Sequence, residues 1–221
     1  MSYILNIETA TKNCSVSLAK DGITVLYQEI AEQGYSHAEK LHVFIEDILK
    51  KSQVNFQEIK AIAVSKGPGS YTGLRIGVST AKGLCYALGI PLISVDTLQV
   101  LAQQVSVENG LIVPMLDARR MEVYSAVFDS NHHKIMEVQA EVLTDKSYAD
   151  ITETIYIVGD CQEKCQTVLT AANFNFLPEV IFPSAKEMSA LSFAKFLQNE
   201  FEDVAYFEPF YLKDFMLPTK K

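Results

Sequence analysis

The chain opens with three short apolar runs separated by turn signals. The runs cover residues 3–8, 14–19 and 23–29, and the pair Asp21-Gly22 lies between the second and the third. Short runs rich in Ile, Val, Leu and Tyr, broken by an Asp-Gly pair, are typical of antiparallel strands joined by tight turns. The pattern predicts a three-stranded meander at the start of the chain.

A helical period follows the meander. Ser36 and Glu39 have the spacing of a capping box, and apolar residues then recur every three to four positions up to Lys50 and Lys51. Lysines suit the last turn of a helix because they interact favourably with the helix dipole. We predict a helix over residues 36–50.

The middle of the chain predicts a strand, a glycine-rich loop and a second helix. The apolar run 59–65 leads into SKGPGSYTGLRIG, and a helical pattern over 71–88 ends at Gly89. A strand over 91–95 and a helix over 96–107 complete this half.

Beyond Gly110 the same order of elements begins again. Strands are predicted over 111–116, 122–128, 134–143 and 155–158, and helices from Asp160 to about residue 172 and over 185–201. Each half therefore opens with a meander and continues with strand and helix units. This repetition predicts a duplicated α/β architecture with one lobe over residues 1–109 and the other over 110–221.

Composition and charge exclude several classes of protein. Of 221 residues, 48% are hydrophobic and 21% are charged, which is a globular composition. The net charge is −8 and the isoelectric point is near 5.0. An acidic chain gains little from counterion release on binding phosphates, so tight binding of tRNA or DNA by this chain alone is not expected.

The cysteines and the N-terminus carry no special signal. Four cysteines are dispersed along the chain without zinc spacing, and we expect them to be reduced. No secretory leader or membrane-length apolar run is present, so the chain is expected to be cytoplasmic.

The glycine-rich loop leaves two interpretations open. Its spacing is G-x-G-x-x-x-G, which matches neither the dinucleotide motif nor the P-loop. A strand running into a helix N-terminus nevertheless resembles a phosphate site. The alternative is a tight turn with close backbone packing, and we expect the structural residues of this loop to be Gly67, Gly69, Thr72 and Gly73.

Small residues also form a stripe on the predicted helix 71–88. Gly73, Gly77 and Ala81 are spaced four residues apart, and a mid-helix glycine costs roughly 1 kcal/mol relative to alanine. Such a stripe indicates close approach of another backbone. That backbone belongs either to the same chain or to a partner.

Several segments resemble a known family. The first meander, IETATKNCSVSL, is similar to the phosphate-binding hairpin of the actin and sugar-kinase superfamily, with Glu8 at the acidic place and Ala10 where a glycine is expected. YSHAEKL, KGPGSYTGLRIGVSTAKGL, ISVDTL, LDARRMEVY and PFYLK together resemble the TsaB (YeaZ) family, a paralogue of TsaD within that superfamily. The last segment departs from the family pattern, because Lys213 replaces an arginine.

The resemblance implies an actin-like fold and a supporting role in tRNA modification. TsaB-like proteins bind TsaD, which transfers a threonylcarbamoyl group to the adenosine 3′ of the anticodon; they also form homodimers and help to recruit the ATPase TsaE. The tRNA is then met only indirectly, through the complex. The resemblance places the partner interface on the first helix and the helix after the glycine loop. The interface residues predicted in this chain are His37, Leu41, Phe44, Ile45, Arg75, Gly77 and Ala81.

The resemblance also predicts that this chain is not the enzyme. TsaD-like proteins carry a metal-binding His-x-x-x-His pair where this chain has Thr97 and Leu101. We therefore expect no catalytic residue, metal or cofactor, and the missing histidines also argue against a metallopeptidase. The charged hairpin 117–120 is expected to form salt bridges, with Asp117 paired to Arg119. The alternative function is a small-molecule kinase or ATPase that uses Glu8, Gly67 and Gly69.

Overall fold

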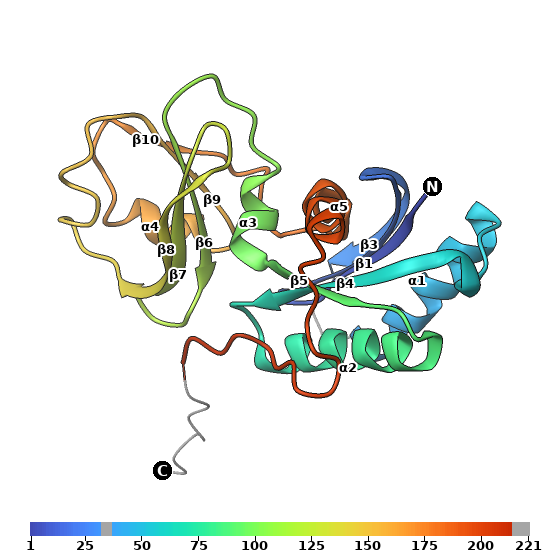
Figure 1. Cartoon of the computed structure of the whole chain (residues 1–221). Coiled ribbons are helices and arrows are strands. Elements are labelled where there is room, and N and C mark those ends of the chain that lie inside the picture. Colours follow the sequence, from blue (N-terminus) through green and yellow to red (C-terminus); the bar gives the residue numbers. More distant parts are fainter. Residues whose placement is uncertain (32–36, 214–221) are drawn as a thin grey trace, which may run out of the picture.

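The computed structural model describes residues 1–31 and 37–213 and contains two five-stranded sheets (Figure 1). The first sheet has the order β3-β2-β1-β4-β5. Its meander is antiparallel, whereas β4 and β5 run parallel to β1. The bounds of its strands are β1 (Tyr3–Glu8), β2 (Asn13–Lys20), β3 (Ile23–Ala31), β4 (Ile59–Gly67) and β5 (Leu92–Asp96).

The second sheet repeats this arrangement. Its order is β10-β9-β6-β7-β8, again an antiparallel meander with two parallel strands beyond its first strand. Its strands are β6 (Leu111–Asp117), β7 (Glu122–Asp129), β8 (Lys134–Val142), β9 (Ile155–Val158) and β10 (Phe174–Phe176). The predicted duplication is confirmed, although β10 has only three residues and no pattern in the sequence indicated it.

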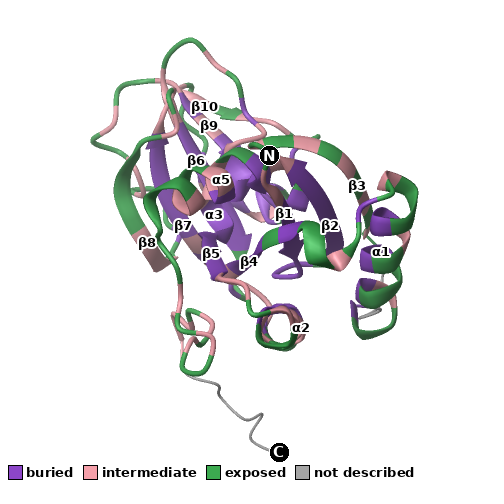
Figure 2. Ribbon diagram, turned by 45° about the vertical axis from the view of Figure 1, so that its right-hand side comes forward, coloured by how far each residue is buried: buried purple, intermediate pink, exposed green. Residues whose placement is uncertain are grey.

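Helices cover both faces of the first sheet. On one face, α1 (His37–Ser52) and α2 (Tyr71–Leu88) bury their apolar sides against β1, β2 and β4, and Figure 2 shows the outward side of α1 exposed. The predicted helix 71–88 is confirmed, with Ser70 as its N-cap and Gly89 in a left-handed conformation after its end. The predicted cap Ser36 lies outside the described residues. A 3₁₀ turn, η1 (Phe56–Glu58), precedes β4.

The opposite face of the first sheet is covered by a helix from the end of the chain. The 3₁₀ turn η2 (Ala185–Glu187) and α5 (Met188–Gln198) pack Ala185 and Met188 against apolar residues of β1, β4 and β5. The prediction of one helix over 185–201 is wrong at both ends, because the first turn is 3₁₀ and Asn199 takes a left-handed conformation. The lobe boundary at residues 109 and 110 stays a prediction.

The second sheet has shorter helices than the sequence pattern predicted. α3 is confined to Thr97–Ala102, and α4 to Gln162–Gln166. Asp160 does not cap α4, because its carboxylate instead accepts a hydrogen bond from the main-chain N–H of Asp117, at 2.8 Å. After α4, the Thr167 hydroxyl donates to the carbonyl of Lys164 at 2.6 Å, and after α3 the main chain continues in single turns as far as Val105.

Two further sequence expectations concern the cysteines and membranes. All four cysteines are buried free thiols. Within residues 1–31 and 37–213, no helix has both the length and the apolar character needed to cross a membrane.

Candidate functional site

Main-chain N–H groups of the glycine-rich loop between β4 and α2 form hydrogen bonds to other groups of the same chain. The N–H of Gly67 donates to the Thr97 hydroxyl at 3.1 Å, and the N–H of Ser70 donates to the carbonyl of Ala10 at 2.6 Å. The N–H of Gly73 donates to the Ser70 hydroxyl at 3.3 Å. A phosphate-binding loop needs such N–H groups to point at the ligand, and here they point at the protein.

Internal packing also explains why these positions are glycine. A Cβ atom on Gly69 would collide with the carbonyl of Ala10, and one on Gly73 would collide with the carbonyl of Thr9. Gly67 has a φ of 118°, and a Cβ there would lie 2.7 Å from the carbonyl oxygen of Phe210. The structural role expected for these three glycines is thereby explained. Thr72, predicted with them, is exposed in the first turn of α2.

The small-residue stripe on α2 packs against the interior of its own chain. A side chain on Gly77 would collide with the Thr9 hydroxyl, and Ala81 is fully buried in the core below the helix. The interpretation that a partner lies against this stripe is therefore wrong. The backbone that approaches it is the end of β1, and glycine is needed there because that approach leaves no room for a Cβ.

The other predicted interface residues are also mostly inside the chain. Leu41, Phe44 and Ile45 pack in the core beneath α1. His37 is 1% exposed, and its Nε2 lies 2.8 Å from the Thr11 carbonyl. Only Arg75 is exposed, with its guanidinium 4.2 Å from the centre of the Tyr71 ring. The apolar period of a helix marks its core face, which is why sequence reasoning selected the wrong side.

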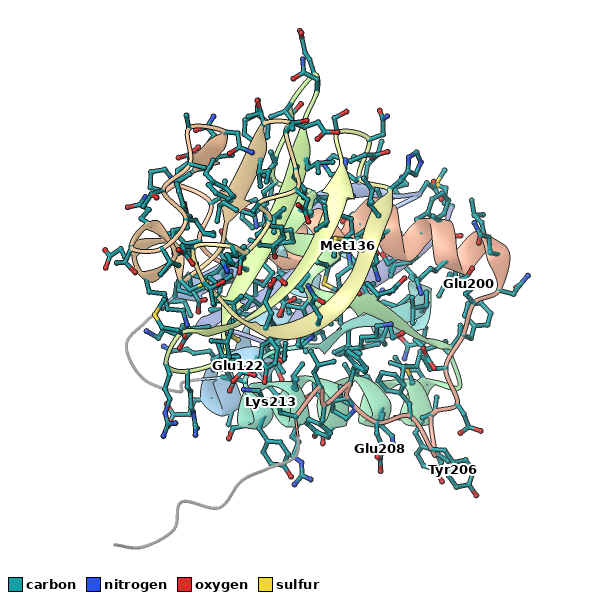
Figure 3. The ribbon with its side chains drawn as sticks, turned by 90° about the vertical axis from the view of Figure 1, so that its left-hand side faces the viewer. Glu122, Met136, Glu200, Tyr206, Glu208 and Lys213 are labelled. Atoms are coloured by element: carbon teal, nitrogen blue, oxygen red, sulfur yellow. The ribbon has the colours of Figure 1, made fainter. Side chains whose placement is uncertain are left out.

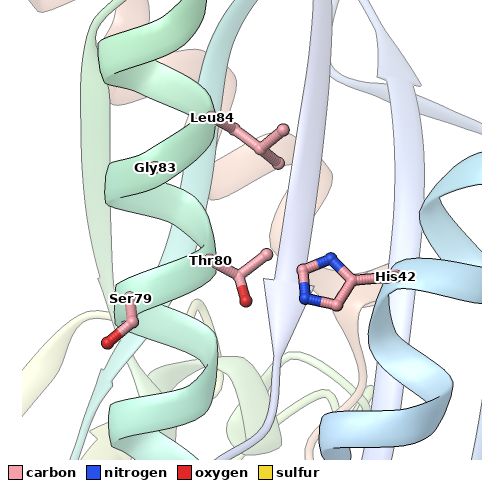
Figure 4. Close-up of a pocket in the computed structure, with 5 residues that line it drawn as sticks. All are labelled: His42, Ser79, Thr80, Gly83 and Leu84. Carbon is pink, nitrogen blue, oxygen red and sulfur yellow. The ribbon is translucent and has the colours of Figure 1, made fainter.

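The exposed sides of α1 and α2 instead line an open hollow of about 380 Å³. Figure 4 shows His42 facing Thr80 across it, with Ser79, Gly83 and Leu84 completing the wall. A Cβ atom added to Gly83 would meet no atom within 4 Å. Internal packing therefore does not require this glycine. Gly83 is therefore the residue that could have indicated this hollow from the sequence. The sequence analysis passed over it because it lies outside the series Gly73, Gly77 and Ala81.

Large apolar side chains are exposed on the same helices. Tyr86 of α2 is 87% exposed and Val43 of α1 is 51% exposed. A second open hollow, of about 480 Å³, lies between Tyr86 and residues 203–205. Aromatic anchors beside hollows are the usual form of a protein-binding surface. We name the exposed residues His42, Val43, Ser79, Gly83 and Tyr86 the α1/α2 groove.

Glu8 lies at the end of β1, beneath the glycine-rich loop, and is completely buried. Its Oε1 accepts a hydrogen bond from the N–H of Ala10 at 2.6 Å, while Oε2 has no well-formed hydrogen bond to any described residue. Burial raises the pKa of the Glu8 carboxyl to about 7, although the N–H of Ala10 and the neighbouring Ser65 hydroxyl act in the opposite direction. An acid sealed in this way is poorly placed to hold a solvated metal.

The hairpin between β6 and β7 does not form the expected pair of Asp117 and Arg119. The carboxylate of Asp117 pairs instead with Lys164 of α4, and only the main-chain N–H of Arg119 reaches it, at 3.3 Å. The side chains of Arg119 and Arg120 are exposed. The lysine reaches the carboxylate because α4 lies beside the hairpin in the folded chain, which local sequence does not reveal.

The positions of the missing histidine pair are occupied by structural residues. Thr97 is buried and bonds to the glycine-rich loop, and Leu101 packs in the core between α3 and β6. Among the residues that the structure describes, no three His, Cys, Asp or Glu side chains are grouped to hold a metal.

The order of the strands and the placement of the helices define the class of protein. A meander followed by two parallel strands, present twice with helices on both faces of the first sheet, is the arrangement of the actin-like ATPase fold. The fold class expected from the sequence is confirmed.

Comparison with known proteins identifies the family. The family model described as "TsaD: tRNA N6-adenosine threonylcarbamoyltransferase" matches residues 25–209. The tRNA threonylcarbamoyladenosine biosynthesis protein TsaB of Escherichia coli is 29% identical over 220 residues, covering 96% of this chain and 94% of that protein. TsaB of Bacillus subtilis is 34% identical over 135 residues, covering 61% of this chain and 58% of that protein.

A solved structure agrees with these sequence matches. YeaZ from Pseudomonas aeruginosa superposes with a TM-score of 0.81 at 25% identity, covering 96% of this chain and all of that chain. The chain belongs to the TsaD family covered by the model and, within it, to the TsaB/YeaZ proteins. The resemblance seen in the sequence is confirmed.

Proposed function

We propose that the protein is an accessory subunit of the machinery that forms N6-threonylcarbamoyladenosine in tRNA. In this proposal it binds TsaD, helps to recruit the ATPase TsaE, and makes or breaks no bond itself. The names of its TsaB relatives support the pathway, and the match to the TsaD family model supports an association with TsaD. Without TsaD, the chain pairs with a second copy of itself.

The observation that carries the binding role is the α1/α2 groove. Gly83 has open space where a side chain would stand, and a mid-helix glycine costs roughly 1 kcal/mol relative to alanine. No internal contact offsets that cost among the described residues. A partner's side chains entering the groove would offset it, with Tyr86 and Val43 supplying apolar contacts. Exposed apolar groups of this kind also favour self-association when the partner is missing.

The glycine-rich loop supports a role without catalysis. Its N–H groups bond to Thr97, Ala10 and Ser70, and the carbonyl of Phe210 lies over Gly67. A nucleotide phosphate would have to displace these groups. The proposal therefore assigns nucleotide chemistry to the partners.

Reconstitution tests the role directly. The chain is combined with TsaD, TsaE, the adenylate-forming enzyme and unmodified tRNA, and threonylcarbamoyladenosine is quantified by mass spectrometry. We expect modification to require this chain. Normal modification in its absence would refute the accessory role, and micromolar Mg-ATP binding that disappears in Glu8→Ala would favour the nucleotide-dependent enzyme.

A substitution at Gly83 tests the groove. Gly83→Leu fills the space between α1 and α2, so we expect association with TsaD to weaken at least about tenfold, as for a blocked contact at an interface centre. Ala194→Leu is the matched control, because it adds a leucine to an exposed position of α5, on the other face of the sheet. Calorimetry measures the affinity, and circular dichroism confirms that both variants fold. Equal affinity of the two variants for TsaD would show that the α1/α2 groove is not the surface that binds TsaD.

A further inference from the structure

The two sheets are packed into separate apolar cores. Buried apolar residues of the first sheet and its helices form two clusters, and those of the second sheet form two others. The short helix α3 contributes to both sides, with Val100 in a cluster of the first sheet and Leu98 and Leu101 in a cluster of the second. One ion pair, between Lys134 of β8 and Asp96 at the end of β5, also joins the two halves. Lobes that share so little apolar surface are expected to move relative to each other unless another contact holds them.

After α5 the chain runs back over the first lobe without forming a helix or a regular strand (Figure 1). The N–H of Glu202 donates to the carbonyl of Leu92 in β5 at 2.9 Å, and Phe207 packs against the apolar cluster beneath α1 and α2. Lys82 of α2 donates to the carbonyl of Phe207 at 2.9 Å. We name residues 202–213 the C-terminal segment. Its first half is therefore fixed to the first lobe.

The middle of the C-terminal segment lies on the glycine-rich loop and on the first turns of α2. The N–H of Phe210 donates to the carbonyl of Lys66 at 2.7 Å. The next residue, Tyr211, packs its ring against that of Tyr71, with the ring centres 5.0 Å apart, and its hydroxyl accepts a hydrogen bond from Nε of Arg75 at 3.2 Å. Main-chain and side-chain bonds together hold this part of the segment on the first lobe.

The last described residue of the C-terminal segment reaches the second lobe. The ammonium of Lys213 pairs with the carboxylate of Glu122 at the start of β7, and Figure 3 shows these two side chains together. The same ammonium lies 3.4 Å from the carbonyl of Ala118 and 6.0 Å from the centre of the Tyr124 ring. Only two residues separate this contact from the ring of Tyr211 on α2. The segment therefore joins α2 to the β6–β7 hairpin over a short length of chain.

We propose that the C-terminal segment fixes the angle between the two lobes, without a ligand between them. Two-lobed proteins commonly close around a ligand that bonds to both sides, whereas here a segment of the chain itself bonds to both sides. Residues 203–205 of the same segment line the hollow beside Tyr86, so this hollow is held in a fixed position relative to the second lobe. The inference goes beyond the proposed function, because the segment acts in the same way in the isolated chain.

Pulsed electron paramagnetic resonance tests the inference by measuring the distance between two spin labels, one on each lobe. The labels are attached to Lys60→Cys in β4 and to Lys146→Cys after β8, which are both exposed positions. The four natural cysteines are buried, so they should not react with the label. The width of the distance distribution then reports how far the lobes move relative to each other.

Three variants release or restore the contacts of the C-terminal segment. Lys213→Glu breaks the ion pair with the second lobe, and adding Glu122→Lys restores the pair with its charges exchanged. Tyr211→Ala removes the ring contact and the hydrogen bond on α2. The control, Lys195→Glu, makes the same change of charge but breaks an ion pair with Glu200, which lies on the first lobe alone. Circular dichroism confirms that every variant folds.

We expect a single narrow peak of distances for the natural chain and for the control. Lys213→Glu replaces an attraction by a repulsion, so the population of other distances should rise about tenfold, and Tyr211→Ala should have an effect in the same direction. The exchanged pair should return the narrow peak. A distribution equal to that of the control in either single variant would overturn the inference. A broad distribution that persists in the exchanged pair would also overturn it, because the ion pair would then not be the contact that holds the lobes.

Discussion

The hydroxyl of Thr9, at the end of β1, donates a hydrogen bond to the carbonyl of Gly73 in α2 at 2.8 Å. The same hydroxyl fills the space above Gly77, where a Cβ atom would collide with it. The β1–β2 turn and α2 are therefore fitted to each other without a gap. This contact, and not an external partner, explains the stripe of small residues on α2.

Gly77→Ala should destabilise the fold. The added methyl group has no room beside Thr9, and overpacking of a well-packed core typically costs about 1–3 kcal/mol. Urea unfolding measures the change. Thr9→Ala removes the clashing hydroxyl, so the double variant should lose less stability than the sum of the two single variants.

Gly83→Ala is the matched control on the same helix. Its methyl group meets no atom within 4 Å, and alanine is the better helix former, so the free energy of unfolding should rise by about 0.5–1 kcal/mol. If both glycines responded alike to alanine, the distinction drawn between them would be wrong.

Glu8 should make stability depend on pH. Its pKa in the folded chain is about 7, raised from 4.5, so folding favours the protonated carboxyl. The stabilisation is complete below about pH 4.5 and is lost as the pH rises through 7. Glu8→Gln mimics the neutral acid, and we expect it to gain stability relative to the natural chain by up to about 3 kcal/mol at pH 8.5, with little difference at pH 5.

Urea unfolding of both chains at several pH values measures this difference. Glu58→Gln is the control, because Glu58 is an exposed glutamate at the end of η1, directly before β4. A stability difference for Glu8→Gln that does not vary with pH would show that the carboxyl is charged in the folded chain.

Lys82 should fix the C-terminal segment on α2. Its ammonium donates to the carbonyls of Ala205 and Phe207 at 3.1 and 2.9 Å. Lys82→Met keeps the aliphatic stem and removes both bonds, so amides of residues 203–213 should exchange with deuterium about tenfold faster, while those of β1 are unchanged. Lys60→Met serves as the control. Equal exchange in residues 203–213 for the two variants would show that other contacts hold the segment.

Local sequence was sufficient for most of the fold. Short apolar runs bounded by turn signals located the strands of both meanders, and Gly89 indicated the end of α2. These signals act over a few residues, through backbone geometry and capping bonds, so they can be read directly. The three-residue β10 escaped because it is too short to carry a pattern, and its pairing with β9 forms only in the folded chain.

Only the tertiary structure decided which residues of these helices face the core and which charged residues pair. The sequence determined that α1 and α2 have apolar and small-residue faces, and the family motifs determined the class of protein. It did not determine that Leu41 and Gly77 face inward, that Gly83 opens a groove, or that Asp117 pairs with Lys164 instead of Arg119. The physical reason is that burial and charge pairing depend on segments far apart in the chain, which meet only after folding.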